Sequence, residues 1–392
     1  MCCVTQELSL SSKQLRSMVR QALADLRHQA EEAAGAVEEL RFRYRREVQE
    51  WNSQNNELPD LQGNIKVFCR CRGFSAGKSC LDAASEQELL VHGKGSMKKF
   101  LFDKVYPSST SQEEIFEGAL PIITSCVSGY RVCILAYGQS GSGKTYTMTG
   151  TKDKPGVNIR SIRELLHVCK GKENYTFNLK ISMLEIYNDT LYDLLSVNPN
   201  NPLEIRSQGR SISVPGLTHV EVKTEEDILN AMDMVDKNRK IGSTNTESSR
   251  SHLLLTLTLE GRDSASGGSS SGTLTLCDLA GPKHFSKTEA TGQSRVEAAA
   301  INKSLTSLRQ VFSALKSNAL HVPFRNSKLT HLLQPCLSGD AKCLVLVNVN
   351  PDGKHMVETL STLQFGSALR QIALGKTAQH ISPTKNKADK QH

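Results

Sequence analysis

One eight-residue segment, GQSGSGKT at Gly138–Thr145, constrains the fold more than any other stretch of the chain. It satisfies the pattern G-x-x-x-x-G-K-[ST] and lies directly after the apolar run VCILAY, before residues that can start a helix. Glycines let backbone amides curl around phosphate groups, Lys144 neutralises the outer phosphate oxygens, and the Thr145 hydroxyl coordinates Mg²⁺. The segment therefore predicts a phosphate loop; the alternative is a glycine-rich turn that carries Lys-Thr by chance.

Six runs rich in valine, isoleucine and leucine alternate along the chain with longer amphipathic patterns. The runs occupy residues 65–71, 131–138, 177–188, 253–261, 272–281 and 342–350, and the helical patterns occupy residues 289–317 and 324–335. Buried strands interleaved with amphipathic helices are typical of α/β proteins. Together with the phosphate loop they predict a P-loop nucleoside triphosphatase with a mixed central sheet and helices on both faces. The segment SASGGSSSG, residues 264–272, is predicted to be a flexible loop between two strands.

Both ends of the chain depart from this α/β pattern. Residues 11–60 predict a helix, because apolar side chains keep the four-three spacing of a heptad seam, broken by Glu47. The seam consists of Val19, Leu23, Leu26, Ala30, Ala33, Val37, Leu40, Tyr44 and Trp51. Because some of these are alanines, a short coiled coil and a solvated single helix both fit. Residues 1–10 and the polar, basic residues 375–392 are expected to be disordered, which leaves residues 63–374 as the globular domain.

Charge and composition narrow the classes of partner. The net charge of +8 and the pI of about 8.9 favour an acidic partner surface, but the excess is too small to indicate nucleic acid. No apolar run reaches the roughly 18 to 20 residues of a membrane span. The eleven cysteines lack the C-x-x-C repeats of zinc sites and fit a reduced cytosolic protein. We therefore expect neither a membrane nor a nucleic acid as partner.

Two further segments are suited to detecting the terminal phosphate of a nucleotide. NTESSRSH, residues 245–252, can supply the hydroxyls of Ser248 and Ser249 to Mg²⁺ and phosphate, and the charge of Arg250. Alone it would be a serine-rich turn, but it lies one strand before DLAG, residues 278–281. There Asp278 would hold the Mg²⁺ shell through water, and the amide of Gly281 would meet the terminal phosphate.

Seven motifs, in this order, carry a resemblance to the kinesin motor domain. They are FCRCR, AYGQSGSGKTYTM, SMLEIYND, NTESSRSH, DLAG, INKSL and VPFRNSKLT. The resemblance covers roughly residues 63–374, and the preceding helix with LQGNIKVFCR looks like the neck and neck–core junction of the kinesin-14 class. It implies a kinesin motor fold with an N-terminal neck helix, ATP and Mg²⁺ as cofactors, and a microtubule-stimulated ATPase. It also implies microtubules as partner, minus-end direction with Gly63 and Asn64 at the junction, a homodimer through the neck helix, and a place on the cytoplasmic microtubule cytoskeleton, spindle or centrosome.

The resemblance assigns roles to individual residues. Arg70 would flank the adenine, although Gly73 replaces the proline usual in the family. The nucleotide-binding set is Arg70, Gly138, Gln139, Ser140, Gly141, Ser142, Gly143, Lys144, Thr145 and Tyr146. Switch I would contain Asn245, Ser248, Ser249 and Arg250, switch II Asp278 and Gly281, and Mg²⁺ would be held by Thr145, Ser249 and, through water, Asp278. Candidates for the acidic tubulin surface are Asn302, Lys303, Arg309, Lys316, His321, Arg325 and Lys328.

The sequence departs from the family directly after DLAG, where Pro282 and Lys283 replace Ser-Glu. In the family that glutamate pairs with the switch I arginine when the loops close over ATP, whereas Arg250 and Lys283 carry like charges. Losing a buried pair of this kind costs about 3 to 5 kcal/mol, or two to three decades of rate. Two hypotheses follow: an ATP-hydrolysing motor, or a microtubule tether that binds nucleotide and hydrolyses it slowly. The nearest acids in sequence are Glu247 and Glu289, and Glu297 matches a glutamate of the family.

Overall fold

The computed structural model describes most of the chain beyond residue 62. The described ranges are 63–73, 79–93, 96–172, 175–209, 211–242, 250–264, 267–282 and 292–382, with residues 18, 21, 23–33, 35–36, 39 and 43 before them. The chain divides into two units, residues 1–58 and 59–392. In the first unit every described residue is helical, and the seam residues Leu23 and Leu26 are exposed. The remainder of the predicted neck helix and residues 1–10 lie outside the described residues.

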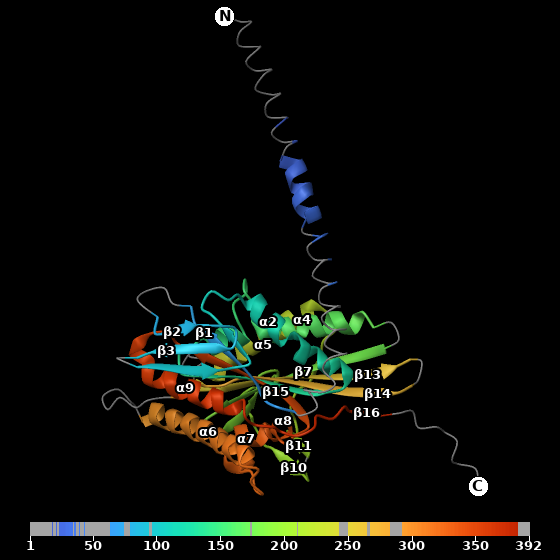
Figure 1. Cartoon of the computed structure of the whole chain (residues 1–392). Coiled ribbons are helices and arrows are strands. Elements are labelled where there is room, and N and C mark those ends of the chain that lie inside the picture. The colour runs from blue at the N-terminus through green and yellow to red at the C-terminus, as the bar shows by residue number, and fades with distance from the viewer. Residues whose placement is uncertain are drawn as a thin grey trace, which may run out of the picture. The chain divides into compact units, whose positions relative to one another are not determined.

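A mixed sheet forms the centre of the second unit, as the sequence predicts (Figure 1). Its strands follow the order β5-β1-β15-β6-β14-β13-β7-β8-β9. The parallel strands are β5 (Lys104–Tyr106), β1 (Lys66–Cys71), β15 (Ala341–Val349), β6 (Arg131–Gly138) and β14 (Ser269–Asp278). The antiparallel strands are β13 (His252–Asp263), β7 (Tyr175–Tyr187), β8 (Thr190–Asp193) and β9 (Pro202–Leu203). Short strands pair outside this path: β12 (Val220–Glu221) with β7, β10 (Arg206–Gln208) with β11 (Ser211–Ser213), and β2 (Leu81–Ala83), β3 (Glu88–His92) and β4 (Met97–Leu101) with one another.

Helices cover both faces of this sheet (Figure 1). One face is covered by α2 (Gln112–Thr124), α4 (Val157–Lys170) and α5 (Glu225–Gly242), and the other by α6 (Gly292–Lys316), α7 (Lys328–Leu332), α8 (Gln334–Leu337) and α9 (Met356–Leu369). The short helix α3 (Lys144–Met148) follows β6, and single 3₁₀ turns η2 (Ser125–Ser128), η4 (Phe324–Asn326) and η5 (Gly353–His355) complete the set. Covering both faces explains why central strands such as β6 are buried almost throughout and read as continuous apolar runs.

Three boundaries differ from the sequence predictions. The loop predicted over residues 264–272 is shorter, because β14 begins at Ser269 and its backbone pairs with β13 although its side chains are small. The helix predicted over residues 289–317 begins at Gly292 among the described residues. The helix predicted over residues 324–335 is split into η4, α7 and α8, because Ser327 is extended and caps α7.

The tail predicted to be disordered from residue 375 is ordered as far as Ser382, so that part of the prediction is wrong. Residues Ile381–Ser382 form β16, which pairs with the start of β14, and the backbone of His380 bonds to Ser271 and Gly129. This segment is polar and bonds through its backbone, so composition gave no sign of it. Residues 383–392 lie outside the described residues.

The start of the ordered domain lies beside residues 373–375. The Leu374 amide donates to the Gly63 carbonyl at 3.0 Å, and Asn64 bridges Ala373. Gly63 has a φ of 58°, and a Cβ there would lie 1.8 Å from the Gly375 carbonyl oxygen. Only glycine therefore fits this junction. No helix in the described part of the chain is long and apolar enough to cross a membrane.

Candidate nucleotide site and its neighbours

The phosphate loop lies at the carboxyl end of β6, between this buried parallel strand and α3. Gly143 at the start of α3 has a φ of 95°, a left-handed conformation that favours glycine. The Lys144 ammonium is buried and donates to the carbonyl oxygens of Gly138 at 2.9 Å and Gln139 at 2.8 Å. The cation is thus held inside the curl of the loop, where the phosphates of a nucleotide need a positive charge.

The side chains of Thr145 and Asp278, both predicted for a magnesium shell, lie in contact. The Thr145 hydroxyl donates to Oδ2 of Asp278 at 2.7 Å. Asp278 is 4% exposed, and its Oδ1 has no hydrogen-bond partner among the described residues. Burial raises the pKa of Asp278, and the Thr145 hydrogen bond and the charge of Lys144 oppose this shift. A threonine hydroxyl beside a buried carboxylate oxygen with spare acceptor capacity is a donor set that fits Mg²⁺.

A cavity of about 680 Å³ opens above the loop and is large enough for a nucleotide. Its lining includes seven of the ten predicted nucleotide-binding residues: Arg70, Gly141, Ser142, Gly143, Lys144, Thr145 and Tyr146. The other three are not among the lining residues. Gln139 turns away and accepts from the Thr359 hydroxyl of α9, and the Ser140 hydroxyl donates to the Pro282 carbonyl at 3.4 Å.

Arg70 is fixed at the wall of this cavity by contacts that the sequence motifs did not indicate. Its guanidinium donates to the side chains of Gln112 at 2.7 Å and Thr147 at 3.0 Å, and lies 5.1 Å from the ring centroid of Tyr146. Burial lowers the pKa of Arg70. Arg72, also missed by the sequence analysis, donates to the Gly141 carbonyl at 2.5 Å.

The DLAG segment lies directly against the phosphate loop. A Cβ on Gly281 would lie 2.5 Å from the backbone nitrogen of Ser140, so the two backbones approach as closely as glycine allows. The Ala280 amide donates to Nδ1 of His252 at 3.0 Å. Predicted partners at both switches fall outside the described residues, namely Asn245, Glu247, Ser248, Ser249, Lys283 and Glu289.

Arg250 bonds to an acid that sequence proximity did not select. Its Nη1 donates to Oε2 of Glu297 at 2.7 Å, and the Tyr187 hydroxyl donates to Oε1 of the same carboxylate at 2.6 Å. Glu297 is on α6 and 3% exposed. The sequence matched Glu297 to the family without giving it this contact, because the two residues are 47 positions apart.

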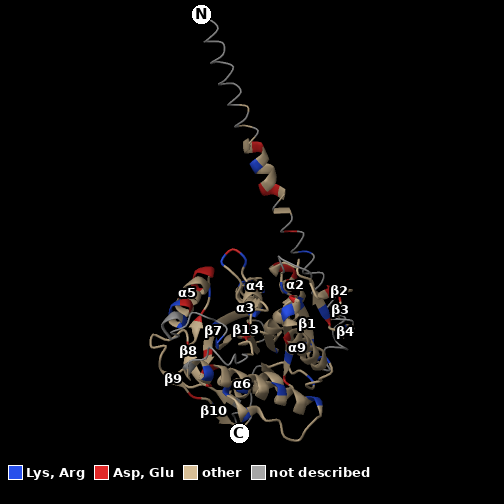
Figure 2. Cartoon of the chain, turned by 90° about the vertical axis from the view of Figure 1, so that its left-hand side faces the viewer, with Lys and Arg blue, Asp and Glu red and all other residues tan. Residues whose placement is uncertain are grey.

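The residues predicted for an acidic partner are spread over α6, the segment after it, η4 and α7, and Figure 2 shows basic residues spaced along α6. Lys316, His321 and Arg325 are exposed. Lys303 pairs with Asp189 at 2.8 Å, and Lys328 pairs with Glu204 at 2.6 Å. Arg309 turns back onto the domain, where it donates to the Tyr137 hydroxyl and its guanidinium lies 5.3 Å from the ring centroid of Phe365. Arg309 is thus engaged by its own domain, although its side chain remains exposed.

A phosphate loop at the end of a parallel strand, facing a carboxylate from the next strand, defines the molecule as a P-loop nucleoside triphosphatase. The model of the kinesin motor domain family matches residues 51–372, and the chain belongs to this family. Among its curated relatives, kinesin-like protein KIN-14H of Arabidopsis thaliana is 41% identical over 85% of the chain, and KIN-14E of Oryza sativa subsp. japonica is 38% identical over 88%. The chain matches about a third of the length of each of these two proteins, 33% in both cases.

Solved structures show the same fold. A fast kinesin is 32% identical, with a TM-score of 0.76 over 84% of this chain and 99% of that one. A KIF14 dimer in complex with a microtubule is 29% identical, with a TM-score of 0.74 over 81% of this chain and 96% of that one. The predicted kinesin motor fold and the kinesin-14 resemblance are confirmed.

Proposed function

We propose that the chain is a microtubule-stimulated ATPase and a motor of the kinesin-14 type, using ATP and Mg²⁺. The observation that carries the proposal is the contact of Thr145 with Asp278 beside Lys144, at the bottom of a cavity of nucleotide size. The magnesium ion would neutralise phosphate charge when bound. The chain's own groups would orient the nucleotide: Arg70 and Tyr146 beside the base, the loop glycines at the phosphates, and the backbone of Gly281 at the terminal phosphate.

The partner proposed is the acidic surface of tubulin, which the exposed basic residues around α6 suit by charge. Ionic attraction of this kind weakens with salt, so microtubule affinity should fall as ionic strength rises. The related KIF14 dimer in complex with a microtubule supports this proposal. We further propose a minus-end direction from Gly63 and Asn64, a homodimer through the neck helix, and a place on the cytoplasmic microtubule cytoskeleton, at the spindle or centrosome. A gliding assay on polarity-marked microtubules tests the direction, and sedimentation of the full chain tests the dimer.

A second function, a microtubule tether that binds nucleotide and hydrolyses it slowly, is favoured by two observations. Position 283 carries a lysine, which cannot accept a hydrogen bond from Arg250, and Arg250 bonds to Glu297 instead. In the family, a glutamate at this position handles the proton and the attacking water. This chain therefore has no acid at that position of the sequence.

One experiment separates the two functions. ATP turnover is measured with and without microtubules for the wild-type chain and for Lys283→Glu. Stimulated turnover of ordinary size in the wild type, unchanged in the variant, supports the motor and contradicts the tether. Turnover that stays low in the wild type and rises by two or more decades in Lys283→Glu supports the tether. Absence of ATP binding in both proteins would overturn both functions.

A further inference from the structure

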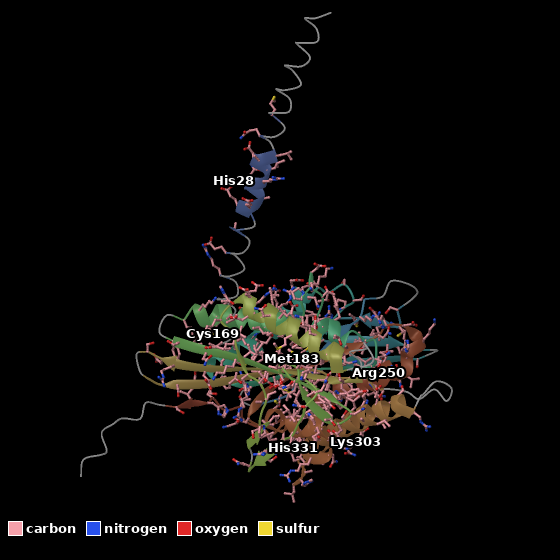
Figure 3. All side chains as sticks on the ribbon, turned by 180° about the vertical axis from the view of Figure 1, so that it is seen from behind. His28, Cys169, Met183, Arg250, Lys303 and His331 are labelled. Carbon is pink, nitrogen blue, oxygen red and sulfur yellow. The ribbon has the colours of Figure 1, made fainter. Side chains whose placement is uncertain are left out.

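Helix α6 is joined to the nucleotide side of the molecule by a cluster of buried and half-buried polar side chains, which we call the Glu297 cluster: Tyr187, Arg250, His252, Glu297 and Ser304. Tyr187 is the last residue of β7 and His252 the first of β13, and the two strands pair with His252 opposite Ile186. Glu297 and Ser304 are seven residues apart on α6, about two helical turns, and so lie on the same face. Figure 3 shows Arg250 beside this helix and Lys303 on it.

Both carboxylate oxygens of Glu297 accept a hydrogen bond within this cluster. One oxygen accepts from the Tyr187 hydroxyl at 2.6 Å and the other from Arg250 at 2.7 Å. At 3% exposure this carboxylate needs a positive partner, and Arg250, whose side chain is 26% exposed, provides the charge. The ion pair therefore holds the arginine on α6, at the end of the predicted switch I motif.

A second connection runs from the same helix to the phosphate loop. Nε2 of His252 is 2.7 Å from the Ser304 hydroxyl, and Nδ1 accepts from the Ala280 amide. The next residue, Gly281, lies against Ser140 of the phosphate loop. A shift of α6 would therefore disturb the arginine through Glu297 and the DLAG backbone through His252 together.

We propose that Glu297 is the positioning residue for Arg250, and that coupling between the nucleotide site and the microtubule-binding helix passes through the Arg250–Glu297 pair rather than through residue 283. The proposal rests on the proposed function, since it assigns α6 to the microtubule face. In this proposal a movement of α6 carries Glu297 away from Arg250 and releases the arginine, so removal of the Glu297 charge uncouples the two sites.

The test uses the full chain with Glu297→Gln, which keeps an acceptor for Tyr187 and replaces the other oxygen by an amide that repels Arg250. Microtubule dissociation constants are measured by co-pelleting with ADP and with AMP-PNP. We expect the ratio of the two constants to shrink about tenfold in the variant, within the ordinary range of coupling between sites. Asp103→Asn is the matched control: it breaks a partly buried pair with Arg370, 3.1 Å apart, outside the cavity and α6, and should keep the wild-type ratio.

A purely structural role would lower the melting temperature of Glu297→Gln and leave the ratio of dissociation constants within twofold of wild type, and this result would overturn the proposal. Tyr187→Phe is a second variant in case Glu297→Gln does not fold. It keeps the ion pair, loses one hydrogen bond to Glu297, and should shrink the ratio about threefold. An unchanged ratio in that variant also contradicts the proposal. If the wild-type chain binds microtubules equally with both nucleotides, the proposed function fails and not this assignment alone.

Discussion

His252 gives a prediction whose size follows from the structure. Burial, with a contribution from the charge of Lys144, lowers the pKa of His252 to about 3. A second proton on the imidazole, at Nδ1, would also point at the Ala280 amide, which already donates a hydrogen bond to that nitrogen. Replacement by asparagine keeps an acceptor for that amide, loses the contact with Ser304, and removes the titration.

The pH dependence follows from linkage. Because the pKa of the folded state lies below the unfolded value of about 6.5, the unfolded chain binds more protons as the pH falls. The free energy of unfolding therefore decreases by about 1.4 kcal/mol per pH unit below 6.5, a loss of about 2 kcal/mol between pH 7.5 and pH 5. The lost hydrogen bond makes His252→Asn less stable by about 1 to 2 kcal/mol at pH 7.5. The two proteins should then have nearly equal stability close to pH 5.

Urea unfolding at half-unit steps from pH 5 to pH 7.5 checks this for wild type and His252→Asn. Other titrating groups are common to both proteins, so the difference between their free energies of unfolding isolates His252. Parallel curves, with the variant less stable by a constant amount at every pH, would refute the argument that the imidazole is buried and neutral.

Three further predictions concern the nucleotide site and the edge of the sheet. Asp278→Asn should weaken Mg²⁺-dependent nucleotide binding at least tenfold, as measured by calorimetry. Because the substitution removes a buried carboxylate, it should also raise the free energy of unfolding without nucleotide by about 1 kcal/mol, as measured by urea unfolding. Gly281→Ala should lower the free energy of unfolding by about 1 to 3 kcal/mol and weaken nucleotide binding, because the added Cβ would lie 2.5 Å from the Ser140 nitrogen. Gly353→Ala, with open space around its Cβ, is the control. Deletion of residues 379–392 should lower stability by about 1 to 3 kcal/mol through the loss of β16 and its backbone hydrogen bonds, whereas deletion of residues 383–392 should not.

Each of these has an outcome that contradicts it. Lower stability of Asp278→Asn without nucleotide would mean that the carboxylate is well compensated. Equal stability of Gly281→Ala and Gly353→Ala would mean that the DLAG backbone is not held against the loop. Equal melting temperatures for the two truncations would mean that β16 contributes nothing to the sheet.

The parts of the site that sequence predicted are those encoded within a few residues. Lys144 and Thr145 belong to a contiguous motif that follows an apolar run, and Asp278 ends another apolar run. The motif and the aspartate could therefore each be placed at the end of a strand from the sequence alone. The same reasoning gave the mixed α/β sheet, because burial on both faces leaves long Val, Ile and Leu runs.

The contacts that sequence missed join distant segments and leave no local pattern. Arg250 and Glu297 meet only because the start of β13 and α6 pack together, and Gln112 reaches Arg70 of strand β1 from helix α2. The order of residues 375–382 was missed for another reason: β16 pairs through backbone groups, which every residue possesses, so its polar composition carried no information.

The junction of Gly63 with Leu374 determines how force enters the motor core. Tension on the chain before Gly63 acts on the Gly63–Leu374 and Ile65–Ile372 backbone hydrogen bonds, and through them on the start of β1. β1 is bonded along its length to β15, and β15 to β6, the strand that ends in the phosphate loop. A load applied to the chain before Gly63 would therefore be separated from the phosphate loop by two inter-strand ladders, β1–β15 and β15–β6, a short mechanical path with no loop in it.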